Sequence, residues 1–188
     1  MLRKISALSL VLLFVPLAAC QFATAQAQTS AAPATTSLDS LKFLVGKWIG
    51  EGTAETGQGG GGHCSFEPGL QGKVLIRKNH SEYPAAKDHP AIVHDDLMII
   101  YADNSKHQLR AFYTDNEGHV IHYTVSAAPG GKSAIFLGDI EPGAPRYRLT
   151  YTITTPGHMT IDFKMAPPSS PGQFQKFISG KLRLSSSN

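Results

Sequence analysis

Residues 46–52 read Gly-Lys-Trp-Ile-Gly-Glu-Gly, and they open a region of about ten short strand-like segments that runs from Lys47 to Leu184. Turn residues separate these segments at spacings of roughly 8 to 12 residues, and no convincing helix lies between them. This pattern is typical of an all-β sandwich or barrel, whereas strands alternating with helices would indicate a parallel sheet. We therefore predict a single up-and-down antiparallel β-barrel of about ten strands.

The opening stretch also predicts how the barrel begins. Its three glycines allow a strand to bend and neighbouring backbones to approach closely at a barrel corner. Trp48 has a ring large enough to bury under the end of a cavity. We expect it to seal the barrel floor, with contact to a ligand as the alternative. A short helical turn over residues 37–45, capped by Ser37, is expected to plug one end of the barrel.

The first 19 residues have the pattern of a signal peptide. Arg3 and Lys4 precede an apolar run that is shorter than the roughly 18 to 20 residues of a membrane-spanning helix. The run ends in Leu-Ala-Ala-Cys, which resembles the bacterial lipobox, so Cys20 is expected to become a lipid-bearing N-terminus. Ordinary cleavage after Ala27 is the alternative, and it would leave a soluble periplasmic or secreted protein.

The segment from residue 20 to residue 37 is uncharged and almost free of large apolar side chains. It cannot bury enough surface to offset the entropy of the chain, so we predict a disordered tether. By resemblance to known lipoproteins, Gln21 in place of Asp favours the outer membrane, with the protein facing the periplasm. Residues 38–188 then form one barrel domain.

Charge and cysteine content narrow the possible functions. The formal net charge is +3, and two of the basic residues lie in the predicted signal peptide. No basic patch remains to contact several phosphates, which argues against nucleic-acid binding. Cys64 is the one cysteine of the barrel region, so it has no intramolecular disulfide partner there. We expect a small buried side chain, because one thiol beside His63 falls short of the four ligands usual for zinc.

Alternation along the strands predicts which side chains line the interior. One face of the segment after residue 146 and the facing side of the next segment form an apolar set: Tyr147, Leu149, Tyr151, Ile153, Met159, Ile161, Phe163 and Met165. From this set we predict Tyr151 and Phe163 as ligand contacts. Tyr113, which also combines an apolar ring with a hydroxyl group, is predicted to line the cavity as well.

The opening motif carries a resemblance to known barrels. Residues 43–52 resemble the start of nitrobindin-like proteins and of a bacterial lipocalin-like family of unknown function, in which Leu-x-Gly-x-Trp-x-Gly-x-Gly begins the first strand. Residues 94–97 and 112–119 also resemble the second family. The resemblance implies a calycin-like barrel with a Trp near its floor and an apolar cavity, as in fatty-acid-binding proteins. Haem, as in nitrobindins, would require a histidine near the final strands, where His158 is the nearest candidate.

The polar residues do not form a catalytic signature. His119 and His122 are three residues apart, so on one strand they would point to opposite faces and could not chelate one metal ion. His122 is expected to face solvent, or alternatively to line the cavity. His94 and the two aspartates after it could supply a general base or part of a cation site. A polar strand start is the preferred interpretation.

Arginines within the strands offer a different kind of contact. Arg77, Arg110 and Arg148 each lie in a predicted strand, and an inward guanidinium could bind a ligand carboxylate through paired N–H bonds. Arg110 is our candidate for this role. For any single one of these arginines, a solvated outer position is the preferred interpretation.

The sequence therefore predicts a lipid-anchored barrel that binds a small apolar or amphipathic ligand, with no metal and no cofactor. Alternatives are an accessory envelope lipoprotein with a filled barrel, a haem-binding nitrobindin-like protein, or an enzyme of the isomerase or cyclase type. Converging inward polar groups at an open cavity would favour a binding protein or an enzyme, whereas a packed interior would favour the accessory protein. The sequence does not indicate an oligomeric state.

Overall fold

A computed structural model describes residues 36–51, 61–85, 87 and 90–186 of the chain. The predicted signal peptide, the lipidation site at Cys20 and nearly all of the tether lie outside the described residues. Within the described part, no helix is long and apolar enough to cross a membrane.

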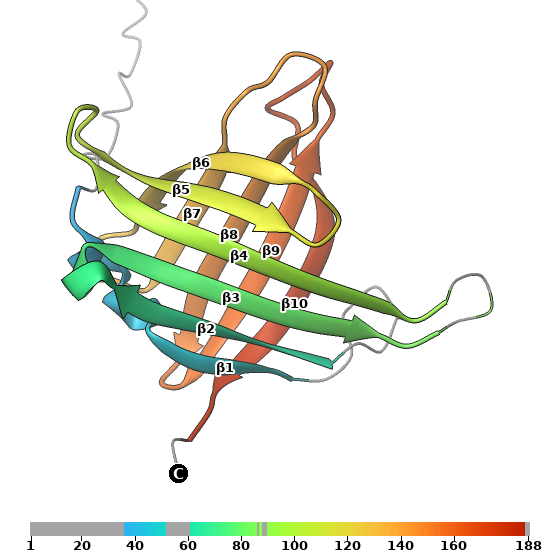
Figure 1. Ribbon diagram of the computed structural model, residues 1–188, viewed down its shortest axis with the longest axis horizontal. Helices are drawn as coiled ribbons and strands as arrows, with labels where there is room; N and C mark the ends of the chain where they lie inside the picture. The colour runs from blue at the N-terminus through green and yellow to red at the C-terminus, as the bar shows by residue number, and fades with distance from the viewer. Residues whose placement is uncertain (1–35, 52–60, 86, 88–89, 187–188) are drawn as a thin grey trace, which may run out of the picture. The chain divides into compact units, whose positions relative to one another are not determined.

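The described residues form ten strands that close into one antiparallel barrel, in the order β1-β10-β9-β8-β7-β6-β5-β4-β3-β2 (Figure 1). The strands are β1 (Gly46–Glu51), β2 (Gly61–Gly69), β3 (Val74–Tyr83), β4 (Ile92–Asp103), β5 (Gln108–Asp115), β6 (Val120–Ala127), β7 (Ser133–Gly138), β8 (Arg146–Thr155), β9 (His158–Ala166) and β10 (Gln175–Leu184). Each strand pairs with its sequence neighbours, and β1 closes the sheet against β10. The predicted up-and-down barrel is confirmed.

Local sequence signals explain most of the strand ends. Glycines with positive φ lie in the tight connections, among them Gly118 (φ 89°) between β5 and β6 and Gly157 (φ 76°) between β8 and β9. Strand β1 is described only as far as Glu51, because residues 52–60 lie outside the described part.

A short 3-10 helix, η1 (Leu38–Leu44), precedes β1 and confirms the predicted helical turn. The Ser37 hydroxyl accepts a hydrogen bond from the Asp39 N–H, as expected of an N-cap residue. Leu41 and Leu44 are fully buried and belong to the hydrophobic core together with Trp48. The Trp48 indole N–H donates to the Leu44 carbonyl oxygen at 2.8 Å, which joins helix and barrel at this end.

Inward-facing side chains fall into two groups along the barrel. The first, which we call the closed half, is at most 2% exposed and includes Leu41, Leu44, Trp48, Phe66, Met98, Ile100, Leu109, Tyr123, Phe136 and Tyr151. The second, which we call the open end, keeps partial exposure although its side chains also point inward: His94, Tyr113, Ile121, Tyr147, Ile161 and Phe163. Because an inward side chain stays exposed only beside space that water can reach, the barrel is packed at one end and accessible at the other.

Candidate functional site

The open end has one polar wall and one apolar wall. The polar wall is the inner face of β3, β4 and β5, and it carries Asn79, Ser81, His94, Asp96, Tyr113 and Asp115. The apolar wall lies on β6, β8 and β9, and it carries Ile121, Tyr147, Ile161 and Phe163, all packed against the core. Tyr147 and Phe163 stack with ring centroids 5.5 Å apart. A molecule at this end would meet hydrogen-bonding groups on one side and hydrocarbon on the other.

A buried ion pair forms the base of the polar wall. The Arg77 guanidinium donates to the Asp96 carboxylate, and their side chains are only 5% and 3% exposed. Burial opposes the charge on Arg77, but the negative charge of the adjacent Asp96 carboxylate holds the pKa of the guanidinium above its ordinary value. The inward arginine that the sequence allowed is therefore Arg77, and its partner is a carboxylate of the same chain.

The Arg77–Asp96 pair lies against the aromatic interior of the closed half. The Arg77 guanidinium carbon is 6.0 Å from the ring centroid of Tyr151. Edge-to-face contacts then link Tyr151 to Phe66 and Phe136, and Phe136 to Tyr123. The Tyr151 hydroxyl and the Arg77 Nε are buried without a hydrogen-bond partner among the described residues. Burial raises the pKa of the Tyr151 hydroxyl well above its usual value, so it stays neutral.

Above this pair, a hydrogen-bond network reaches the rim of the barrel. His94 Nε2 lies 3.4 Å from Asp96 Oδ2, and His94 Nδ1 lies 3.0 Å from Glu117 Oε1. The Tyr113 hydroxyl donates to Asp115 Oδ2 at 3.0 Å and lies 3.3 Å from His94 Nε2. Exposure rises along the network, from 3% for the Asp96 side chain through 24% for His94 to 48% for Glu117. The network therefore connects the interior with solvent.

Charge in the network favours protonated His94 and ionised Asp115. The hydrogen bond to Asp96 raises the pKa of His94 to about 9, with partial desolvation opposing it and Glu117 adding to it. Burial acts to raise the pKa of Asp115, but bonds from the His119 N–H, the His119 ring and Tyr113 lower it overall. Burial, with Asp96 and Asp115 nearby, raises the pKa of Tyr113 far above its ordinary value. Tyr113 is therefore a hydrogen-bond donor at neutral pH.

A cavity of about 240 Å³ opens at this end, between the start of β6 and the connection from β7 to β8. Inward Ile121 and Tyr147 line it together with His119 and the outward-facing His122 and Asp139. It therefore lies beside the polar wall, none of whose residues line it. Its volume is below the range of about 300 to 1,000 Å³ typical of sites for drug-sized ligands. The cavity suits a small molecule or one part of a larger one.

Three of the predicted contact residues share the barrel interior. Tyr113 and Phe163 lie at the open end on opposite walls, and Tyr151 lies deeper, in the closed half. Tyr151 pairs with Ile161 across the β8–β9 hairpin; Tyr151 belongs to the hydrophobic core and Ile161 packs against it. The face of β8 and β9 that was predicted to point inward is therefore the one that packs on the core.

Two of the other three candidate contact residues lie outside the barrel interior, and the third lies at its plugged end. Arg110 is on the outer face of β5, where it donates to Thr124 Oγ1 at 2.7 Å and to Asp139 Oδ1 at 3.0 Å. His122 is exposed on the outer side of β6 and reaches the cavity only at its rim. Trp48 is 2% exposed and lies at the end plugged by η1. Arg110 and Tyr113 are three residues apart on one strand, so alternation places them on opposite faces.

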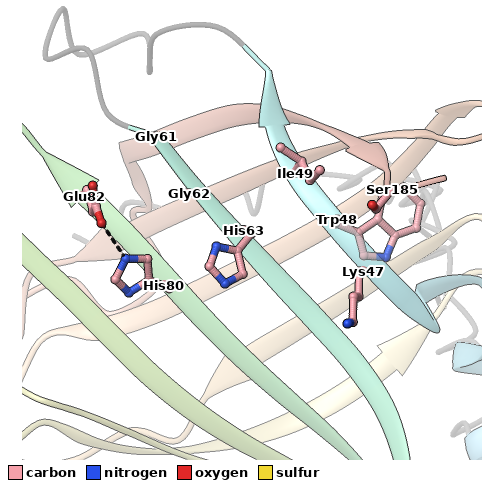
Figure 2. Close-up of a pocket in the computed structure, with 9 residues that line it drawn as sticks. All are labelled: Lys47, Trp48, Ile49, Gly61, Gly62, His63, His80, Glu82 and Ser185. Carbon is pink, nitrogen blue, oxygen red and sulfur yellow. Dashed lines mark hydrogen bonds and ion pairs between the residues drawn. The ribbon is translucent and has the colours of Figure 1, made fainter. Parts of the chain in front are cut away.

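A larger groove of about 540 Å³ lies on the outside of β1, β2 and β3 (Figure 2). His63 and His80 lie side by side there, with ring centroids 5.3 Å apart, and His80 bonds Glu82 and Asp95. Hydrogen bonding to Glu82 and Asp95 raises the pKa of His80. Residues 52–60, which lead directly into Gly61 at the edge of the groove, lie outside the described part, so the surroundings of the groove are described only in part. We therefore assign no ligand to this groove.

Two histidine arrangements bear on the cofactor expectations. His158 Nδ1 lies 3.3 Å from Glu51 Oε2, and the His158 side chain is 48% exposed, outside the barrel interior. A different group gathers ligand atoms suited to a metal: the described atoms of His94, Asp115 and Glu117 lie within 4.8 Å of one another. From the sequence we expected no metal site, with His94 and the two aspartates after it as the alternative. That analysis missed Asp115 and Glu117, because they meet His94 only through the β4–β5 pairing and the turn after β5.

Comparisons with known proteins do not identify a family for this chain. No protein-family model matches the chain, and no curated protein matches it. A similar solved structure is titled "Structure of EF1p2_mFAP2b bound to DFHBI"; it is 13% identical, with a TM-score of 0.36, over 78% of this chain and 97% of that chain. Similarity at this level carries no argument about function. The closed antiparallel barrel of ten described strands fits a calycin-like fold.

Proposed function

We propose that this protein binds a small amphipathic molecule at the open end of its barrel. The observation that carries the proposal is the division of this end into a polar wall on β3–β5 and an apolar wall on β6, β8 and β9. Ligand sites are typically concave and mostly apolar, with a few fixed polar groups that orient the ligand. The resemblance of residues 43–52 to nitrobindin-like and lipocalin-like barrels supports the same proposal.

The polar wall indicates which chemistry the ligand carries. Tyr113 offers a neutral hydroxyl, protonated His94 offers N–H groups, and Asp115 and Glu117 offer carboxylate oxygens. Arg77 is already bonded to Asp96, so a ligand carboxylate would have to displace a buried partner. We therefore favour a neutral or amine-bearing polar group on the ligand over a carboxylate.

Titration of the full chain with N-phenyl-1-naphthylamine, a neutral amphipathic dye, tests the proposal. We expect saturable fluorescence enhancement at one site per chain. Ile161→Thr should weaken binding about tenfold, because it replaces hydrocarbon on the apolar wall by a hydroxyl group. The matched control is Ile135→Thr, since Ile135 lies on the outer face of β7 and is 39% exposed. Absence of saturable binding, or equal weakening by the two variants, would favour the filled accessory barrel instead.

We also propose that Cys20 carries lipid and holds the barrel at the envelope, where it faces the periplasm. The support is the sequence pattern alone: a short apolar run ending in Leu-Ala-Ala-Cys, followed by an uncharged segment. Growth with a fatty-acid analogue should label the wild-type protein and leave Cys20→Ala unlabelled. A mature N-terminus at Gln28 would show instead that the signal is cleaved after Ala27.

A further inference from the structure

Three potential metal ligands converge at the rim of the open end, and a fourth lies beside them. His94 Nδ1 on β4 lies 3.0 Å from Glu117 Oε1, and ligand atoms of His94, Asp115 and Glu117 lie within 4.8 Å of one another. His119 Nδ1 adds a second imidazole, 2.9 Å from Asp115 Oδ2 and 3.7 Å from Glu117 Oε2. Zinc holds its N and O ligands at about 2.0 to 2.2 Å, so ligand atoms around one ion lie about 3 to 4 Å apart. Small side-chain movements would close His94, Asp115 and Glu117 around an ion, whereas His119 would have to swing in from beside Asp115.

The backbone holds this group in place without help from an ion. The turn after β5 is fastened to the start of β4 by Asn116, whose side chain donates to the Val93 carbonyl oxygen and accepts from the Asp95 N–H. Within the turn, Asp115 Oδ1 accepts from the N–H groups of Glu117 and His119. Ligands fixed in this way lose less conformational entropy on binding than ligands on a free loop.

A buried carboxylate orients His94 toward the centre of the group. Asp96, held by Arg77, faces His94 Nε2, which leaves Nδ1 directed at Glu117. Metal-binding histidines commonly donate their second ring N–H to a carboxylate, which fixes the tautomer and the ring orientation. The arrangement of Asp96, His94 and the rim ligands has this form, and it distinguishes the group from an ordinary cluster of surface acids.

The charge balance also favours a divalent cation. Metal binding requires neutral imidazoles, so it would release the proton of His94. The carboxylates of Asp96, Asp115 and Glu117 would then face the guanidinium of Arg77, which leaves two negative charges. A divalent ion would balance them. Two imidazoles and two carboxylates suit Zn²⁺ and its first-row neighbours, whereas Mg²⁺ and Ca²⁺ prefer oxygen ligands alone.

We propose that His94, Asp115, Glu117 and His119 form a binding site for a divalent transition-metal ion of the Zn²⁺ type. The proposal does not depend on the small-molecule ligand. The two sites would overlap, because His94, Asp115 and Glu117 are also the groups offered to that ligand, and His119 lines the 240 Å³ cavity.

Titration of the chelator-treated full chain with Co²⁺ and Zn²⁺ tests the site. We expect one ion per chain, visible Co²⁺ absorption bands typical of nitrogen and oxygen ligands, and Zn²⁺-induced shifts of the ¹⁵N signals of the His94 and His119 rings. Glu117→Gln should weaken binding at least about tenfold. Its side chain is 48% exposed, so folding should be unaffected and thermal melts should confirm this.

The matched control is Glu82→Gln. Glu82 lies on the outer face of β3, where it bonds His80 beside Asp95, so the control also changes a carboxylate next to a histidine. The affinity of the Glu82→Gln variant for Zn²⁺ should stay within about twofold of the wild-type affinity. Equal weakening by the two variants, thiolate-to-cobalt charge-transfer bands, or the absence of saturable binding would each overturn the proposal.

Discussion

The two halves of the barrel interior differ in how completely side chains fill them. In the closed half, Phe66, Phe136 and Tyr151 meet edge to face and leave no exposed surface. At the open end, Tyr147 and Phe163 stack as closely, yet both remain partly exposed. Similar residue types on similar strands thus serve stability at one end and an accessible surface at the other. The difference shows that inward orientation alone does not identify a binding residue.

The two halves should differ most in how strongly the loss of one aromatic ring destabilises the protein. We expect Phe136→Ala to destabilise the protein by about 3 to 5 kcal/mol, because it leaves a cavity among fully buried neighbours. Phe163→Ala should cost only about 1 kcal/mol, since this ring is already partly exposed. Urea unfolding of both variants would measure the difference. Equal losses would mean that the open end is as tightly packed as the closed half.

The next largest loss of stability should come from breaking the Arg77–Asp96 ion pair, which lies between the two halves. Asp96→Asn is expected to cost about 3 kcal/mol, because it leaves the buried Arg77 charge without its counter-charge. The control is Asp139→Asn, which removes the partner of Arg110 on the outer face and should cost less than about 1 kcal/mol. Chemical denaturation gives both values. A small loss for Asp96→Asn would show that water reaches Arg77 from the open end.

A substitution in strand β1 should have an intermediate effect on stability. A Cβ atom at Gly50 would lie 3.3 Å from the Gly62 carbonyl oxygen, closer than an ordinary contact. Gly50→Val should therefore cost about 1 to 3 kcal/mol by crowding the β1–β2 pairing. Gly61→Val is the control, because a Cβ there would meet nothing within 4 Å. If thermal melts gave the same stability for the two variants, backbone crowding would not limit substitution at this corner.

The smallest effect should come from single hydroxyl groups. Tyr151→Phe removes a buried hydroxyl without a described partner, so stability should stay unchanged or rise by up to about 1 kcal/mol. Tyr113→Phe removes the donor to Asp115 and should cost about 1 kcal/mol. Differential scanning calorimetry can resolve the two. A clear loss for Tyr151→Phe would reveal a bound water molecule or ligand at this hydroxyl.

The candidate site was only partly predictable from the sequence, and β5 shows why. Polar and apolar residues occupy both of its faces, so alternation does not identify the inner one. We predicted Arg110 and Tyr113 together as ligand contacts, although residues three apart on a strand face opposite sides. The structure places Tyr113 inside and Arg110 outside against Asp139. Alternation along the strand could have shown that Arg110 and Tyr113 do not both face inward. It could not have shown which of the two does.

The sequence by itself determined the strand succession, the turns and the helical plug, because these depend on neighbouring residues. Gly118 and Gly157 supply the positive φ of their turns, and Ser37 caps η1, whatever the rest of the chain does. Only the tertiary structure decided that Arg77 pairs with Asp96 and that His94 meets Glu117, 23 residues away in the sequence. Those contacts depend on strand register, and register is fixed by the packing of the whole closed sheet.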